Sequence, residues 1–234
     1  MKPFEIEASL RKLLVHYPDP ALLLQVALEG GKEAQETIAR LWLSEGIPSV
    51  FCICPAIYDS IRCWIADRLE VKAKEIGLVG SAQLGKSFDP HKLGAPFIDK
   101  KSDLDFFIIS DNLFAKLKED FARWAYDFTC GRLTATNRER RFWKSNLKRS
   151  SDNIHQGFID ANTIPPFSKY PTAEKIQKTM ELLIRRLKNT EDAPKPKKAS
   201  IRCYTSWDSF VQQKSLNLRI LGRTVEKMAL QPTT

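Results

Sequence analysis

The chain has 234 residues, of which 43% are apolar, and a formal net charge of +9. This length and apolar content suit a folded protein with a substantial core and exclude general disorder. No apolar run approaches the length of a membrane-spanning helix and no signal peptide is visible at Met1–Phe4, so we expect a cytoplasmic protein with no membrane partner.

The positive charge and the cysteine spacing restrict which partners and metal sites the protein can have, but neither identifies one. The charge favours an anionic partner, and nucleotide binding, nucleic-acid binding and simple solubility all account for it. The five cysteines lack the paired spacing of a zinc site, and we expect them to be reduced thiols: Cys52, Cys54, Cys63, Cys130 and Cys203.

Residues 1–45 are predicted to be a helical extension without evident chemistry. Tyr17–Pro20 is a clear break, Gly30 and Gly31 form a second one, and residues 32–44 carry another apolar stripe. The first stripe comprises Phe4, Ile6, Leu10, Leu13 and Leu14. Residues 48–69 then predict an entry turn and a helix, with Pro55 in its first turn, which packs on a sheet that begins at Ile76.

The central stretch, residues 78–110, is the most informative part of the chain. It opens with an apolar run that ends in Gly80-Ser81, and it closes with Asp103-Leu104-Asp105 leading into an apolar strand. Alternate side chains of a strand share a face, so Asp103 and Asp105 point the same way. Two adjacent carboxylates repel each other, and a divalent cation between them relieves that repulsion.

The turn before these carboxylates suits a phosphate. Gly80 lets the backbone approach a ligand closely, and Ser81 offers a hydroxyl and an N–H group where a helix begins. The stretch between them contains Asp89-Pro90 and Gly94-Ala95-Pro96, which we interpret as an inserted loop. A purely structural alternative is an edge strand with a solvated acidic turn.

The remaining chain predicts three helices and two strands. Helices are expected over residues 112–128, over 172–188 with Thr172 as the N-cap, and from Trp207 to about residue 230. A short strand that includes Ile154, Phe158 and Ile159 ends at Asp160, and a half-exposed strand covers residues 199–206. Residues 189–198 read as a surface loop.

The basic segment 136–149 interleaves positive charges with Phe142 and Trp143 and is predicted to be helical. Such a pattern suits a triphosphate or single-stranded nucleic acid. A solvated helix face with two core aromatic residues explains it equally well. Together, the elements predict a mixed α/β (α+β) fold: an N-terminal helical extension at 1–45, and a core at 46–234 with a small mixed sheet, flanking helices and a C-terminal strand and helix.

The Gly-Ser turn followed by Asp-x-Asp on an apolar strand resembles the DNA polymerase β-like nucleotidyltransferase superfamily. The wider run from Gly46 through Gly80-Ser81 to residues 153–160 and 200–210 is similar to a group of bacterial stand-alone nucleotidyltransferase-domain proteins. Relatives of this general kind occur in bacterial anti-phage and toxin–antitoxin systems, which makes antiviral defence a functional hypothesis.

The resemblance implies a site and a reaction. Asp103 and Asp105 would bind Mg²⁺ or Mn²⁺, with a third carboxylate from a later, neighbouring strand. Asp160 is our choice for that third ligand, and Asp208 is the alternative, although it would equally serve as an acidic first-turn residue of the last helix. The turn would hold the phosphates of a nucleoside triphosphate such as ATP. Its predicted nucleotide-binding residues are Gly80, Ser81, Lys86 and Ser87.

The expected activity is metal-dependent transfer of a nucleoside monophosphate from an NTP or dNTP to a hydroxyl, with release of pyrophosphate. Three acceptors fit this reaction: a nucleotide, a nucleic acid or a protein. A nucleotide acceptor would give an oligonucleotide signal. The regions outside the core suit a homo-oligomer or a partner protein. Two alternatives remain, a non-catalytic module that binds nucleic acid or a partner, and a transferase for small molecules such as aminoglycosides.

Overall fold

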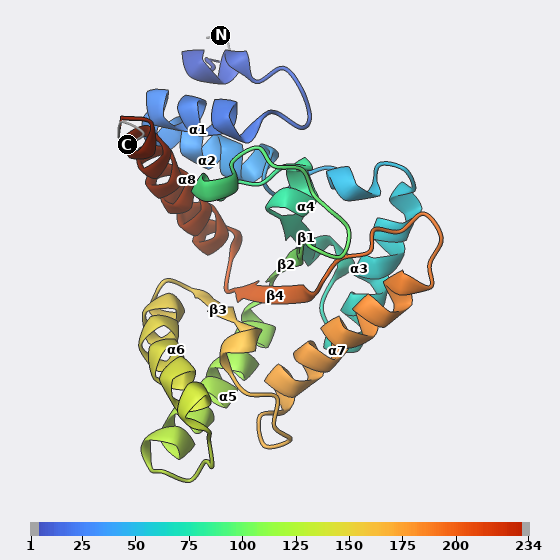
Figure 1. Cartoon of the computed structure of the whole chain (residues 1–234), viewed down its shortest axis with the longest axis vertical. Helices are drawn as coiled ribbons and strands as arrows, with labels where there is room; N and C mark the ends of the chain where they lie inside the picture. Colours follow the sequence, from blue (N-terminus) through green and yellow to red (C-terminus); the bar gives the residue numbers. More distant parts are fainter. Residues whose placement is uncertain (1–4, 231–234) are drawn as a thin grey trace.

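The computed structural model describes residues 5–230, so Phe4 of the first predicted stripe lies outside the described residues. Within this range the protein is mostly helical, with eight α-helices around one four-stranded mixed sheet (Figure 1). The helices are α1 (Pro20–Glu29), α2 (Gly31–Leu41), α3 (Pro55–Leu69), α4 (Ser81–Leu84), α5 (Asp111–Thr129), α6 (Asn137–His155), α7 (Pro171–Lys188) and α8 (Trp207–Leu230). Five short 3₁₀ turns are η1 (Ala8–Lys12), η2 (Ser49–Phe51), η3 (Ala73–Glu75), η4 (Pro90–Lys92) and η5 (Ala161–Thr163).

The sheet has the order β1-β2-β4-β3, so the last strand in sequence lies inside it. Strands β2 and β4 are parallel, whereas β1 pairs antiparallel with β2, and β3 antiparallel with β4. The strands are β1 (Ile76–Val79), β2 (Leu104–Ile109), β3 (Phe158–Asp160) and β4 (Ala199–Tyr204). The predicted small mixed sheet that begins at Ile76 is confirmed.

One face of the sheet is covered by helices α3, α5 and α7. Its side chains alternate with those of the other face, and Leu78, Phe106 and Ile201 point into this core, where none is more than 1% exposed. The apolar stripes predicted for residues 48–69 and 112–128 supply the helical side of the same core. Burial of these stripes is the main term that stabilises the layer.

The opposite face is apolar only toward the end of β2 and β4. Phe107, Tyr204 and Phe158 pack there with Phe210 from the first turns of α8, and the Phe107 and Phe210 ring centroids are 4.5 Å apart. A Cβ at Gly77 would lie 2.4 Å from the Phe107 ring, so glycine makes room for this ring in β1. Strand β4 is therefore more buried than the predicted half-exposed strand, because α8 covers it.

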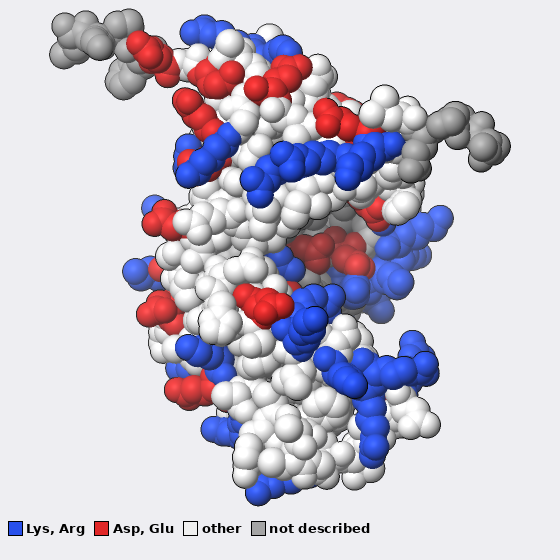
Figure 2. Space-filling model, turned by 90° about the vertical axis from the view of Figure 1, so that its left-hand side faces the viewer, with Lys and Arg blue, Asp and Glu red and all other residues white. Residues whose placement is uncertain are grey.

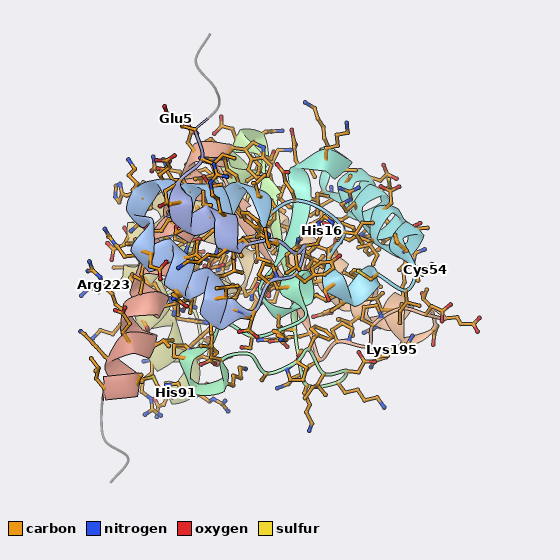
Figure 3. All side chains as sticks on the ribbon, turned by 90° about the horizontal axis from the view of Figure 1, so that it is seen from above. Glu5, His16, Cys54, His91, Lys195 and Arg223 are labelled. Atoms are coloured by element: carbon orange, nitrogen blue, oxygen red, sulfur yellow. The ribbon has the colours of Figure 1, made fainter. Side chains whose placement is uncertain are left out.

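The N-terminal extension shares a core with the C-terminal helix. Helices α1 and α2 pack against α8, and Leu23, Ile38 and Leu218 meet in this second cluster (Figure 1). Seen from above, α1 and α2 cover this end of the molecule (Figure 3). The first predicted stripe is only partly right: Leu10 and Leu13 are buried, whereas Leu14 is 87% exposed and Ile6 54% exposed.

The boundaries of α6 and α7 differ from the predicted ones. Helix α6 continues through Ile154, so the strand that follows contains only Phe158–Asp160. The N-cap of α7 is Tyr170 and not Thr172. The buried carboxylate of Asp120 on α5 takes over capping, because its Oδ2 accepts hydrogen bonds from the N–H groups of Thr172 and Ala173 at 2.8 and 3.0 Å.

In residues 5–230 no helix is both long and apolar enough to cross a membrane. All five cysteines are free thiols, as expected from their spacing.

Replacement of Asp120 by alanine should destabilise the fold, because it leaves two N–H groups at the start of α7 without their acceptor. We expect the free energy of unfolding to fall by about 1–2 kcal/mol. Chemical denaturation of Asp120→Ala would measure the change. Glu119→Ala, at the exposed neighbouring position of α5, is the matched control and should change stability by less than about 0.5 kcal/mol. Equal stabilities of the two variants would contradict the capping role.

Candidate active site

The turn at Gly80-Ser81 lies directly between β1 and α4. Gly80 has φ 72° and ψ −146°, a backbone conformation that is essentially restricted to glycine. A Cβ added there would meet nothing within 4 Å, so the requirement comes from the backbone angles and not from crowding. Ser81 opens α4, whose N-terminus has no side-chain cap.

Register brings this turn to the aspartates. Val79, the residue before Gly80, is the Cα partner of Asp105 in the antiparallel β1–β2 pair. On its other side Asp105 pairs with Ser200 of β4, whose Oγ donates a hydrogen bond to Asp105 Oδ1 at 2.7 Å. The predicted neighbours Gly80, Ser81 and Asp105 are therefore close in the structure, and Asp105 remains exposed.

Asp103 precedes β2 and has one oxygen in an unusual state. Lys198 Nζ lies 3.4 Å from Asp103 Oδ2. Asp103 Oδ1 is buried and has no hydrogen-bond partner, and it is the only carboxylate oxygen of this kind in residues 5–230. A buried, unpaired carboxylate oxygen is unfavourable, so this atom fits a cation as its partner. The donor set at Asp103 and Asp105 is thus compatible with Mg²⁺ or Mn²⁺.

Asp160 is not brought to the other two carboxylates. It lies on β3, and β4 separates β3 from β2, so the sheet places it two strands across and two residues along from Asp105, roughly 12 Å away. In the described part of the chain no three His, Cys, Asp or Glu side chains are grouped so as to hold a metal ion. The predicted three-carboxylate cluster is absent from this arrangement, and the residue opposite Asp105 on the neighbouring strand is Ser200.

Asp160 instead forms a two-pronged ion pair with Arg202. Arg202 Nε donates to Asp160 Oδ1 at 2.7 Å and Nη2 donates to Oδ2 at 3.0 Å. Burial disfavours the charged guanidinium, but the carboxylate outweighs burial and raises the pKa of Arg202 above its ordinary value. The guanidinium also lies over the Phe158 ring at 4.9 Å. Asp160 therefore orients Arg202 in this structure.

Lys214 of α8 lies near the candidate site, and the sequence analysis did not identify it. Burial, together with the positive charge of Arg202, lowers its pKa to about 7, against the opposing influence of Asp105 and Asp160. Its Nζ lies 5.5 Å from the Phe210 ring centroid. Lys214 thus belongs to the same electrostatic cluster as the carboxylates.

Two other predicted nucleotide-binding residues have different partners. Lys86 Nζ pairs with Asp19 Oδ2 of the α1 N-cap at 2.8 Å. Ser87 holds the inserted loop together, since its Oγ accepts from the Asp89 N–H group at 3.1 Å and its N–H group donates to the Ala95 carbonyl at 2.8 Å. In this conformation both residues hold the loop and not the Gly-Ser turn.

Asp208 and the histidines also lie elsewhere. Asp208 is in the first turn of α8, as the alternative interpretation expected, and it lines a separate pocket between α2 and α8. His16 and His91 are exposed and come from different segments of the chain (Figure 3).

A hollow of about 460 Å³ opens beside the ion pair, between α6, β3, β4 and α8. Asp160 and Arg202 line it, and Asn162 also lines a second cavity of about 360 Å³, whose other walls include Lys197, Lys198 and α7. Figure 2 shows acidic side chains within a recess and basic side chains around it. This pattern suits an anionic ligand that approaches together with a cation.

Comparison of the chain with models of protein families, with curated proteins and with solved structures gives no match in any of the three.

The Asp160–Arg202 pair should be strongly coupled, because each single substitution leaves a half-buried charge without its partner. For the cycle of Asp160→Asn, Arg202→Met and the double variant, we expect a favourable coupling of about 1–3 kcal/mol in the free energy of unfolding. The exposed pair Lys12–Glu29 is the control and should show a clearly smaller coupling. Equal couplings for the two pairs would contradict the argument.

The lowered pKa of Lys214 predicts a pH dependence of stability. Between pH 7 and the ordinary lysine pKa of about 10.4, the unfolded chain keeps a proton that the folded chain has released. Stability from this group therefore rises with pH over that window, by at most about 1.4 kcal/mol per pH unit. Denaturation of the wild type and of Lys214→Met at several pH values would measure this effect. The difference between their free energies of unfolding should increase in favour of the wild type as the pH rises. A difference that stays flat from pH 7 to 10 would refute the assignment.

Proposed function

We propose that this protein is a divalent-metal-dependent nucleotidyltransferase that moves a nucleoside monophosphate from an NTP or dNTP to a hydroxyl group. One observation carries the proposal. The β1–β2 register sets the Gly80-Ser81 turn beside Asp105, where Asp103 keeps a buried oxygen without a partner. A glycine-serine turn and two carboxylates that suit a cation are thus brought to one end of the sheet.

Asp103 and Asp105 are the residues that would hold Mg²⁺ or Mn²⁺. When bound, the metal supplies positive charge that stabilises the entering and leaving oxygens at the α-phosphorus. Ser200 holds Asp105 by its hydrogen bond and so limits the carboxylate to one orientation. Asp160 has the role of a positioning residue for Arg202 and becomes a ligand only if that ion pair opens.

Cationic side chains of this chain would bind the donor phosphates. Arg202 is oriented by Asp160 and presents a planar guanidinium, which matches phosphate geometry. Lys198 adds positive charge next to Asp103, and Lys214 adds an amine that is close to Asp105 in electrostatic terms. Gly80 and Ser81 offer backbone and hydroxyl groups to the same phosphates. The entry of an anionic donor would compete for the cations that now neutralise the carboxylates.

The proposal extends to the acceptor and to the biological role. The acceptor hydroxyl belongs to a nucleotide, a nucleic acid or a protein, and antiviral defence in the cytoplasm rests on resemblance alone. A second candidate function is a metal-independent binding module. It is favoured by the cationic partners of Asp103 and Asp160, which neutralise both carboxylates without any metal.

Asp103→Ala and Asp105→Ala should each reduce nucleotidyl transfer by at least about 100-fold. Each variant removes a metal ligand, and this loss costs more activity than the loss of a residue that only supports a ligand. Purified protein would be incubated with Mg²⁺ or Mn²⁺ and each labelled NTP or dNTP, with and without RNA or protein, and the products weighed by mass spectrometry. Asp67→Ala, an exposed acid on α3, is the matched control and should retain full activity.

Thermal shifts on the same samples distinguish the two candidates. An enzyme is stabilised by nucleoside triphosphate together with metal, and this stabilisation is lost in Asp103→Ala. Stabilisation by nucleic acid alone, with no product from any donor, would support the binding module and reject the enzyme.

A further inference from the structure

Helix α6 carries a concentration of positive charge that the protein does not neutralise. It holds six Lys and Arg residues but only two acidic ones, and all eight are exposed. None of the six basic side chains forms an ion pair within residues 5–230, and they are Arg138, Arg140, Arg141, Lys144, Lys148 and Arg149.

The acidic residues of α6 do little to offset this charge. Glu139 closes a capping box, in which its Oε2 accepts from the Thr136 N–H group at 2.8 Å and from the Thr136 hydroxyl at 2.7 Å. Like charges three or four residues apart, such as Arg140 and Lys144, repel each other and destabilise a helix. A bound polyanion would relieve this repulsion and release counterions.

The two aromatic residues of α6 have different environments. Trp143 is buried and packs edge-on against Trp124 and Phe128, so it belongs to the core. Phe142 is 54% exposed, directly follows Arg141 and lies two residues before Lys144. An exposed aromatic ring among cations is a platform on which a nucleic-acid base stacks. Only one of the two aromatic residues of the basic segment therefore belongs to the core.

Phe142 faces the hollow beside the candidate active site. Phe142, Arg149 and Asn153 line it from one face of α6, at helical spacing, and Gln156, the C-cap of this helix, continues the same wall. The opposite wall has the amide side chains of Gln213 and Asn217 on α8, and the lining also includes Asp160 and Arg202. At about 460 Å³ the hollow admits a small-ligand-sized group such as a nucleotide and is too small for a duplex.

We propose that α6 and this hollow bind single-stranded nucleic acid, with a base stacked on Phe142 and Arg149 on the backbone phosphates. Its assignment as the acceptor rests on the proposed function: the strand binds with its end past Arg202, where it reaches the carboxylates. The exposed cations farther along α6 contact phosphates outside the hollow. Side-chain amides that line the hollow offer hydrogen bonds to base edges and sugars.

Binding is tested without metal or triphosphate, so the result is independent of catalysis. Fluorescence anisotropy would use labelled oligouridine and oligothymidine of about 12 nucleotides and a duplex of equal length. Phe142→Leu should weaken single-strand binding by about 5- to 100-fold, whereas Phe142→Tyr, which keeps the ring, should bind as the wild type does. Melting temperatures of the variants check that the fold is intact.

Charge contributions are separated by salt dependence. Arg141→Gln with Arg149→Gln should lower the slope of log Kd against log salt by about 1.4, since each lost phosphate contact removes about 0.7. Arg219→Gln with Arg223→Gln removes two exposed charges from α8 and is the matched control, which should change neither the slope nor Kd appreciably.

Equal weakening by Phe142→Leu and Phe142→Tyr, equal effects of the two charge variants, or duplex binding as tight as single-strand binding would each overturn the proposal. So would the absence of binding by the wild type. If Asp103→Ala binds the strand normally while the wild type transfers no nucleotide to it, the binding site stands and the proposed enzyme fails.

Discussion

The arrangement of the candidate site depends on how α8 covers the sheet. Aromatic packing of Phe107, Tyr204 and Phe210, together with the 2.8 Å hydrogen bond from the Tyr204 hydroxyl to Gln213, holds the first turns of α8 against one half of the face. The helix then leaves the sheet to pack on α1 and α2 (Figure 1). The other half of the same face is left open, and it carries Asp105 and Arg202.

That open half balances charge before any ligand binds. Lys198 lies by Asp103, Arg202 holds Asp160, and Lys214 experiences the charges of Asp105, Asp160 and Arg202. Asp103 and Asp160 thus each have a cationic partner that offsets the cost of their partial burial. The same balance gives the recess both signs of charge, as a site for a metal together with a phosphate ester requires.

The N-terminal helices support the site from a distance. They complete the apolar surroundings of α8 through Leu23, Ile38 and Leu218, and Asp19 ties the inserted loop to α1 through Lys86. Helix α8 packs against both the site and this second cluster, so the packing of one affects the position of the other. The extension is thus part of the structure that positions Lys214, although its described residues, 5–45, contribute no side chain to the site.

The sequence by itself determined the local features. Periodicity placed most of the α-helices to within a few residues, and the apolar run before Gly80-Ser81 predicted a strand that ends at this turn. Helix and strand formation follow from residue patterns over short stretches, so a local pattern is sufficient to predict them.

Only the tertiary structure decided which of these groups meet. The insertion of β4 between β2 and β3 gave Asp160 an arginine partner in place of a metal site shared with Asp105, and it set Ser200 opposite Asp105. Lys214 entered from α8, and Lys86 turned to α1. Strand order and helix placement arise from pairing between segments far apart in the chain, and no local pattern in this sequence specifies those pairings.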